Sequence, residues 1–201
     1  MSTNKNEDVI KYETKNPIVK LFQDNFFKGI NRSMSTIDFE SVFEAGCGSG
    51  YVTDFMKRQY PKADISAMDI NEEKLSIAKA RIKGVKFSIG SIYDIPHPEN
   101  SFDLVISTQV IEHLDDPLNA LKELLRISKR YVIISVPNEP LYRISNMVRL
   151  QHVQAFGNTP GHINHWSKSG ICALANKVCD VRSVQTPFPF IILLCEKRKD
   201  T

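Results

Sequence analysis

Short apolar runs alternate with segments of helical periodicity along this chain. Residues 17–34 repeat apolar side chains at helical spacing, as at Ile18, Phe22 and Phe26, and predict an amphipathic helix. We further expect strands over residues 41–45, 63–69, 85–89, 102–107, 131–136, 181–186 and 190–196, and helices over residues 50–59, 71–83, 116–128, 141–156 and 168–178. This alternation of strands and helices predicts a doubly wound α/β domain.

The clearest chemical signal follows the first expected strand. Glycines at positions 46, 48 and 50 come directly behind Glu44, and an expected helix follows them. Glycine accepts positive φ and lets a ligand approach the backbone closely, so a strand, a glycine turn and a helix are typical of a nucleotide cradle. Dinucleotide-binding proteins usually have their third glycine where this chain has Tyr51. The spacing therefore differs from the usual dinucleotide-binding pattern.

An acidic residue follows at the distance that such a cradle requires. Asp69 ends the second expected strand, 19 residues after Gly50. In nucleotide-binding βαβ units, an acid about 20 residues beyond the glycines accepts hydrogen bonds from the ribose. Alternatively, Asp69 caps the next helix, but Asn71 can provide that cap. We therefore expect Asp69 to bind ribose and Ile70 to offer an apolar face to the adenine.

Four segments resemble the class I S-adenosylmethionine-dependent methyltransferases, and in particular the type-11 methyltransferase domain. They are the glycine turn, the strand ending at Asp69, the turn Gly90-Ser91-Ile92, and the sequence N-S-F-D-L-V followed by E-H-L-x-D-P within residues 100–117. The resemblance runs over about residues 40–138. It implies a Rossmann-like seven-stranded sheet, mostly parallel with an antiparallel last strand, and S-adenosyl-L-methionine as the cofactor. The cofactor-binding residues that it implies are Glu44, Gly46, Cys47, Gly48, Gly50, Asp69, Ile70, Ser91, Ile92 and Thr108.

Methyl transfer requires an acceptor held in line with the sulfonium, and a base where the acceptor must lose a proton. Candidate catalytic residues are His113, in the E-H-L segment, and His162 and His165, in the loop over residues 157–166. As alternatives, His113 supports the local structure, and the loop is a turn in which Trp166 packs on the core and Ser167 caps the next helix. We expect no metal site, because no carboxylate or cysteine lies in this loop.

The composition fits a single domain over residues 1–201. Residues 1–35 are expected to form a helical lid, lined by Tyr12, Phe22 and Phe26, and residues 138–178 an insertion on the acceptor side; alternatively, the helix simply packs on the sheet.

The cysteines form no C-x-x-C pair, and neither a signal peptide nor a membrane-spanning run is visible, so we expect a cytoplasmic protein. The net charge of +3 is small and no basic arm is present, so nucleic acid and membrane partners are not expected. We expect a monomer or a homodimer.

The acceptor is expected to be an oxygen, or a nitrogen, of a small molecule. Enzymes that methylate exocyclic amines typically carry an Asn/Asp-Pro-Pro-aromatic turn after the fourth strand, where this chain has residues 107–110, Ser-Thr-Gln-Val. The motif-rich half is similar to quinone-biosynthesis O-methyltransferases and to enzymes of natural-product and surface-sugar pathways. Two alternatives stay open: a partner protein that binds S-adenosylmethionine without catalysis, and a NAD-dependent oxidoreductase.

Overall fold

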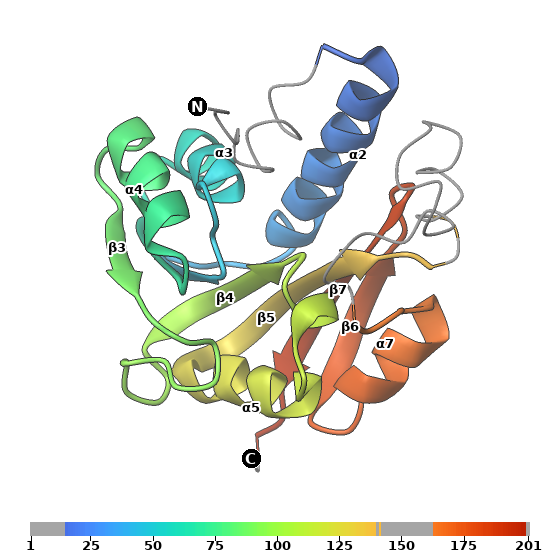
Figure 1. Cartoon of the computed structure of the whole chain (residues 1–201). Coiled ribbons are helices and arrows are strands. Elements are labelled where there is room, and N and C mark those ends of the chain that lie inside the picture. Colours follow the sequence, from blue (N-terminus) through green and yellow to red (C-terminus); the bar gives the residue numbers. More distant parts are fainter. Residues whose placement is uncertain (1–14, 140, 142–162, 200–201) are drawn as a thin grey trace.

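A seven-stranded mixed sheet forms the centre of the computed structural model, which describes residues 15–139, 141 and 163–199 (Figure 1). The strands are β1 (Ser41–Ala45), β2 (Asp64–Asp69), β3 (Lys86–Ile89), β4 (Phe102–Thr108), β5 (Ser128–Pro137), β6 (Cys179–Gln185) and β7 (Phe190–Lys197). Their order is β3-β2-β1-β4-β5-β7-β6. Strands β1 to β5 pair in parallel, and β7 is antiparallel to both of its neighbours. The predicted sheet, mostly parallel with an antiparallel last strand, is confirmed.

Helices cover both faces of the sheet, as expected for a doubly wound domain (Figure 1). They are α2 (Pro17–Met34), α3 (Tyr51–Gln59), α4 (Glu72–Arg81), α5 (Pro117–Ile127) and α7 (Lys168–Ala175), with the short 3₁₀ helix η1 (Ile111–His113) before α5. Helices α2, α3 and α4 lie on one face, and α5 and α7 lie on the other. Each face has its own apolar core, because neighbouring residues of a strand point to opposite sides: Phe43 packs with α5 and α7, whereas Val42 packs with α2 and α3.

The expected elements agree with these bounds to within a few residues. The fifth strand begins earlier than expected, because Ser128 pairs with Phe102 across a register shift between β4 and β5. The helix expected over residues 168–178 ends at Ala175. Residues 142–156 of the helix expected over residues 141–156, and the lid residue Tyr12, lie outside the described residues. Phe26 is buried between α2 and β7, so it belongs to the core and not to a ligand cover.

The helices begin at polar residues that satisfy their first backbone N–H groups. Asn71 accepts a hydrogen bond from the N–H of Lys74 at the start of α4, and Asp116 does the same for α5. Ser167 accepts from the N–H of Gly170 at the start of α7, as the structural alternative for its loop predicts. These caps are local in sequence, which explains why the helix starts were predictable.

The N-S-F-D segment ties the amino ends of two strands together. Asp103 Oδ2 accepts hydrogen bonds from the N–H groups of Glu40 and Ser41 and from Ser41 Oγ, at 2.7–3.0 Å. Lys129 Nζ donates to Oδ1 at 2.7 Å. Partial burial alone would raise the pKa of Asp103, but these hydrogen bonds outweigh it and hold the pKa well below its usual range. Asp103 therefore has a structural role at the amino edge of the sheet.

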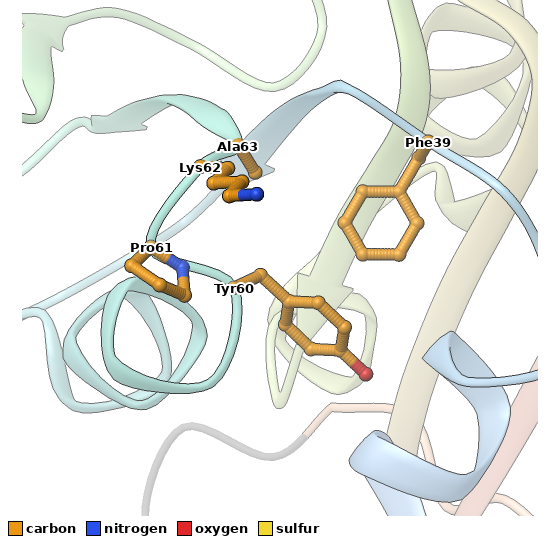
Figure 2. Close-up of a pocket in the computed structure, with 5 residues that line it drawn as sticks. All are labelled: Phe39, Tyr60, Pro61, Lys62 and Ala63. Carbon is orange, nitrogen blue, oxygen red and sulfur yellow. The ribbon is translucent and has the colours of Figure 1, made fainter.

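An open hollow of about 300 Å³ lies at the same amino edge (Figure 2). Its lining residues are Phe39, Tyr60, Pro61, Lys62 and Ala63. The rings of Phe39 and Tyr60 lie 5.0 Å apart, and the Tyr60 hydroxyl donates to Asn31 Oδ1 at 3.0 Å. Ligands of open α/β sheets bind at the opposite, carboxyl edge, so this hollow is separate from the site described next.

Candidate functional site

The glycine turn joins β1 to α3 at the carboxyl edge of the sheet. Gly46, Gly48 and Gly50 have φ values of 78°, 52° and 79°, a region that side chains disfavour. A Cβ on Gly46 would lie 2.4 Å from Val110 Cγ2, so that residue must also be glycine for steric reasons. The N–H of Gly46 donates to the carbonyl of Met68 at 2.8 Å, which fixes the turn against the end of β2.

Asp69 faces the glycine turn from the end of β2. Its Oδ2 accepts a hydrogen bond from the N–H of Gly48 at 2.6 Å, and its Oδ1 accepts from the N–H of Asn71 at 2.8 Å. Asn71, and not Asp69, caps α4. A carboxylate has about four acceptor positions, so Asp69 keeps capacity for further donors such as ribose hydroxyls.

Glu44 lies beneath the turn and is 1% exposed. Burial raises the pKa of its carboxyl to about 7; the hydrogen bond donated by Thr53 Oγ1 lowers it, and the negative charge of Asp69 raises it. Two acids, Glu44 and Asp69, therefore lie close to the turn. None of the causes that set the pKa of Glu44 is a positively charged group. A ligand cation at this position would supply that charge.

The expected adenine-contacting residues differ in their exposure. Ile70 is 75% exposed directly after Asp69, whereas Ile92 is 8% exposed and packs in the core under α5. Ser91 Oγ accepts a hydrogen bond from the N–H of Tyr93 at 3.2 Å within its own turn. Ile70 is therefore the apolar side chain that is open to a flat ring, while Ile92 offers mainly its backbone.

The end of β4 carries a strained residue that the sequence analysis missed. Gln109 has a φ of 57°, although it is not glycine. Its N–H donates to the carbonyl of Ser135 at 3.0 Å, and its Nε2 donates to Ser135 Oγ at 3.2 Å. This turn places Val110 against Gly46 and follows Thr108, which is 7% exposed. No local sequence pattern predicts a left-handed backbone conformation at a glutamine, so this feature is found only in the structure.

The segment after residue 162 packs against η1 at the same edge. The N–H groups of Ile163 and Asn164 both donate to the carbonyl of Glu112 at 3.0 Å, and Asn164 Nδ2 donates to the carbonyl of Leu114 at 2.7 Å. Trp166 packs against the core, as the structural alternative predicts. Asn164 thus acts as a tie between the two segments that carry candidate histidines.

The candidate histidines lie on these two adjoining segments. His113 is exposed at the end of η1. His165 Nδ1 lies 3.9 Å from Oε1 of Glu139, a largely buried acid just beyond β5. His162 lies outside the described residues. The structure therefore brings His113 and His165 to the carboxyl edge of the sheet, on the side of β4 and β5.

Comparison with known proteins agrees with this arrangement. Residues 43–135, which include the glycine turn and the ends of β2 and β4, match the family model of the methyltransferase domain. The matched residues belong to this methyltransferase-domain family. The resemblance seen in the sequence is thereby confirmed. Within the described ranges, no helix is long and apolar enough to cross a membrane.

Two relatives and one solved structure illustrate the likeness of this chain to known proteins. An uncharacterised methyltransferase of Schizosaccharomyces pombe is 33% identical over 101 residues, which are 45% of this chain and 36% of the relative. A malonyl-[acyl-carrier protein] O-methyltransferase of Bacillus anthracis is 29% identical over 123 residues, 60% of this chain and 44% of the relative. The chain thus spans less than half the length of these curated relatives. A SAM-dependent methyltransferase from Aquifex aeolicus shares the fold, with a TM-score of 0.70 at 18% identity, over 97% of this chain and 100% of that chain.

An arginine of α4, Arg81, contacts the end of the glycine turn and the start of α3. The Arg81 guanidinium lies 3.8 Å from the centre of the Tyr51 ring. It donates to the carbonyl of Ser49 at 3.4 Å and to Asp54 Oδ2 at 3.3 Å. Arg81 therefore contacts both the end of the turn and the first turn of α3, which sequence spacing alone does not reveal.

Replacing Arg81 with alanine is expected to lower the free energy of unfolding by about 1–2 kcal/mol, because a cation–π contact and a carbonyl hydrogen bond are lost. Arg58→Ala is the matched control, since Arg58 binds the same Asp54 carboxylate but is 70% exposed. The control should cost less than about 0.5 kcal/mol. Urea denaturation measures both, and equal losses would show that Arg81 acts only through its ion pair.

Proposed function

We propose that this chain binds S-adenosyl-L-methionine at the glycine turn and transfers its methyl group to an acceptor. The observation that carries the proposal is the Glu44 carboxyl, which is buried beneath the turn, has its pKa raised by that burial, and has no positive charge among the causes that set its pKa. The amino group of a bound methionine moiety would supply that charge. The Glu44 carboxylate would instead repel the pyrophosphate of a dinucleotide.

The remaining residues of the turn fit the same ligand. Asp69 has acceptor capacity for the ribose hydroxyls, and Ile70 has an exposed apolar face for the adenine. The other proposed cofactor contacts are Gly46, Cys47, Gly48, Gly50, Ser91, Ile92 and Thr108, largely through the backbone. When bound, S-adenosylmethionine supplies a methyl group on a sulfonium, which is a strong electrophile.

The chain itself contributes orientation, exclusion of water and a proton acceptor. Holding the acceptor in line with the methyl group lowers the barrier by roughly 7–11 kcal/mol when the alignment is good. As the bond to the acceptor forms and the carbon–sulfur bond breaks, the acceptor's proton would pass to a base. We propose His165, beside Glu139, or His113 or His162 for this role. Residues 1–35 and 138–178 are proposed to exclude water as a lid and an acceptor-side insertion.

We propose an oxygen, or a nitrogen, of a small molecule as the acceptor. The O-methyltransferase among the relatives supports oxygen, and the small net charge of +3 favours a small molecule over nucleic acid. All four cysteines are free thiols, which fits a reducing compartment, and we propose a cytoplasmic location.

Isothermal titration with S-adenosylmethionine, S-adenosylhomocysteine and NAD tests the cofactor. We expect binding of the first two and none of NAD. Asp69→Ala should weaken S-adenosylmethionine binding by about 1–3 kcal/mol, because charge-assisted hydrogen bonds are lost. Asp64→Ala is the matched control: Asp64 begins the same strand at the opposite edge and pairs with Lys86 on the surface.

Each other outcome has a defined meaning. Binding of NAD alone would overturn the proposal and favour an oxidoreductase. Equal affinities of the wild type and Asp69→Ala would mean that the ribose site lies elsewhere. Binding of S-adenosylmethionine without turnover on any acceptor, together with a stable protein partner, would favour a non-catalytic role.

A further inference from the structure

The amino-terminal end of helix α2 extends past the carboxyl edge of the sheet. A Cβ on Gly29 would lie 2.7 Å from Cδ1 of Ile192, near the start of β7. One turn earlier, the Phe26 ring lies 5.1 Å from that of Phe190, the first residue of β7. Because β7 begins beside the end of β5, where Phe190 pairs with Pro137, this contact marks the carboxyl edge.

The next turn of α2 lies beyond that edge. The Phe22 ring packs on that of Phe188 at 5.2 Å, in the turn between β6 and β7. This turn is joined to the end of β5, since the N–H of Asn138 donates to the carbonyl of Pro189 at 2.9 Å. Ile18 lies one further helical turn toward the start of α2, on the same stripe. The apolar stripe that packs α2 on the sheet therefore continues beyond the carboxyl edge, on the side of β5 and β7.

The continuation of the stripe is exposed. Ile18 is 49% exposed, Leu21 is 55% exposed and Phe188 is 42% exposed. Ile163 is 54% exposed and lies against η1 beyond the end of β4, and Leu141, 39% exposed, follows β5 by four residues. Apolar side chains gathered at one place on a surface mark a binding site, whereas single ones need no explanation.

The distribution of such side chains over the described residues is uneven. The large exposed hydrophobic residues in the described part of the chain are Ile18, Leu21, Ile70, Ile89, Leu141, Ile163 and Phe188. All of them lie at the carboxyl edge or follow a strand that ends there. Ile70 and Ile89 lie beside the ends of β2 and β3, where the adenine is proposed to bind, and the other five lie on the side of β4, β5 and β7.

We infer that the methyl acceptor is an amphiphile, with an apolar body that packs on Ile18, Leu21, Phe22, Ile163 and Phe188 and one nucleophilic oxygen or nitrogen. The inference rests on the proposed function and names the acceptor class for the same site. The turn that carries Phe188 is tied to the chain next to the candidate base, because Asn138 donates to the carbonyl of Pro189 and the following residue, Glu139, lies 3.9 Å from His165. An apolar body bound here places its polar end at the carboxyl edge beside the glycine turn. Burying apolar surface on both partners drives such binding.

A homologous series of 4-alkylphenols, from 4-methylphenol to 4-hexylphenol, tests the acceptor class. Binding is measured by calorimetry on the full chain saturated with S-adenosylhomocysteine. The dissociation constant should fall about fourfold for each added methylene until the surface is covered. In Leu21→Gln, the dissociation constant of 4-hexylphenol should rise about tenfold while that of 4-methylphenol stays within about twofold. Lys20→Gln is the matched control, a change to the same residue at an exposed polar position of the same helix, and should keep the wild-type series.

The outcomes separate this inference from the proposed function. If S-adenosylhomocysteine binds but affinity for the phenols does not depend on chain length, the acceptor is not apolar and the proposed cofactor stands. If S-adenosylhomocysteine does not bind, the proposed function fails and the inference fails with it. If Leu21→Gln instead abolishes binding to phosphatidylglycerol vesicles, or dissociates a dimer in sedimentation, the surface belongs to a lipid or to a second copy and the inference is overturned.

Discussion

Replacing Gly50 with alanine is expected to lower the free energy of unfolding by about 3 kcal/mol. Gly50 has a φ of 79°, and a left-handed conformation costs a residue with a side chain about 1–2 kcal/mol. The new Cβ would also lie 2.8 Å from Ile82 Cδ1 and 2.9 Å from Ala78 Cβ. Ala78 belongs to α4 and has no flexible side chain that can move away, so the overpacking adds about 1–3 kcal/mol.

Gly84→Ala separates the two causes in the same denaturation experiment. Gly84 has a similar φ of 72°, but a Cβ there would meet only the end of Lys57, at 3.6 Å. The control should therefore show the backbone cost alone, about 1–2 kcal/mol. Equal losses in the two variants would show that α4 yields to the added methyl, and that Gly50 is required for its φ alone.

The affinity for S-adenosylmethionine is expected to rise about tenfold between pH 6 and pH 8, because Glu44 ionises with a pKa of about 7 and only the carboxylate attracts the ligand's amino group. Glu44→Gln should have a lower affinity at pH 8, by about 1.5–3 kcal/mol, and lose the dependence on pH. Calorimetry at several pH values measures both. Glu99→Gln, which changes an exposed acid, should keep the wild-type dependence. If Glu44→Gln keeps the wild-type pH dependence of S-adenosylmethionine affinity, Glu44 does not contact the ligand.

The stability of the ligand-free protein should change with pH in the opposite direction. Burial favours the protonated form of Glu44 and raises its pKa from the ordinary value of 4.5 to about 7. Its contribution to stability is therefore complete below pH 4.5 and is lost as the pH rises through about 7. The loss amounts to about 3 kcal/mol. In Glu44→Gln this part of the pH dependence should be absent from the free energy of unfolding.

Local features explain how much of the fold could be predicted. The bounds of α2 follow from its apolar stripe and from Pro17 at its start, and the cap at Asn71 follows from its own side chain. The glycine turn was visible because its φ values exclude most other residues. The place of Asp69 was predictable because a strand, a turn and a helix of ordinary length bring the next strand's end beside the turn. Their roles toward the ligand stay predictions.

Contacts between distant residues could not be predicted. Asp103 looked like part of a functional motif, yet it binds Glu40 and Ser41 at the amino edge. The pairing of His165 with Glu139 depends on where the chain returns after residue 162. The raised pKa of Glu44 comes from burial, which depends on everything packed around it.

The sequence by itself determined the α/β alternation, the family and the acids at the glycine turn, since periodicity, turn chemistry and strand-to-helix spacing act over a few residues. The tertiary structure alone decided the protonation of Glu44, the left-handed turn at Gln109 and the extension of α2 over the carboxyl edge. These features depend on dielectric, on strain and on the relative position of elements far apart in the chain. Such quantities exist only once the sheet has brought those elements together.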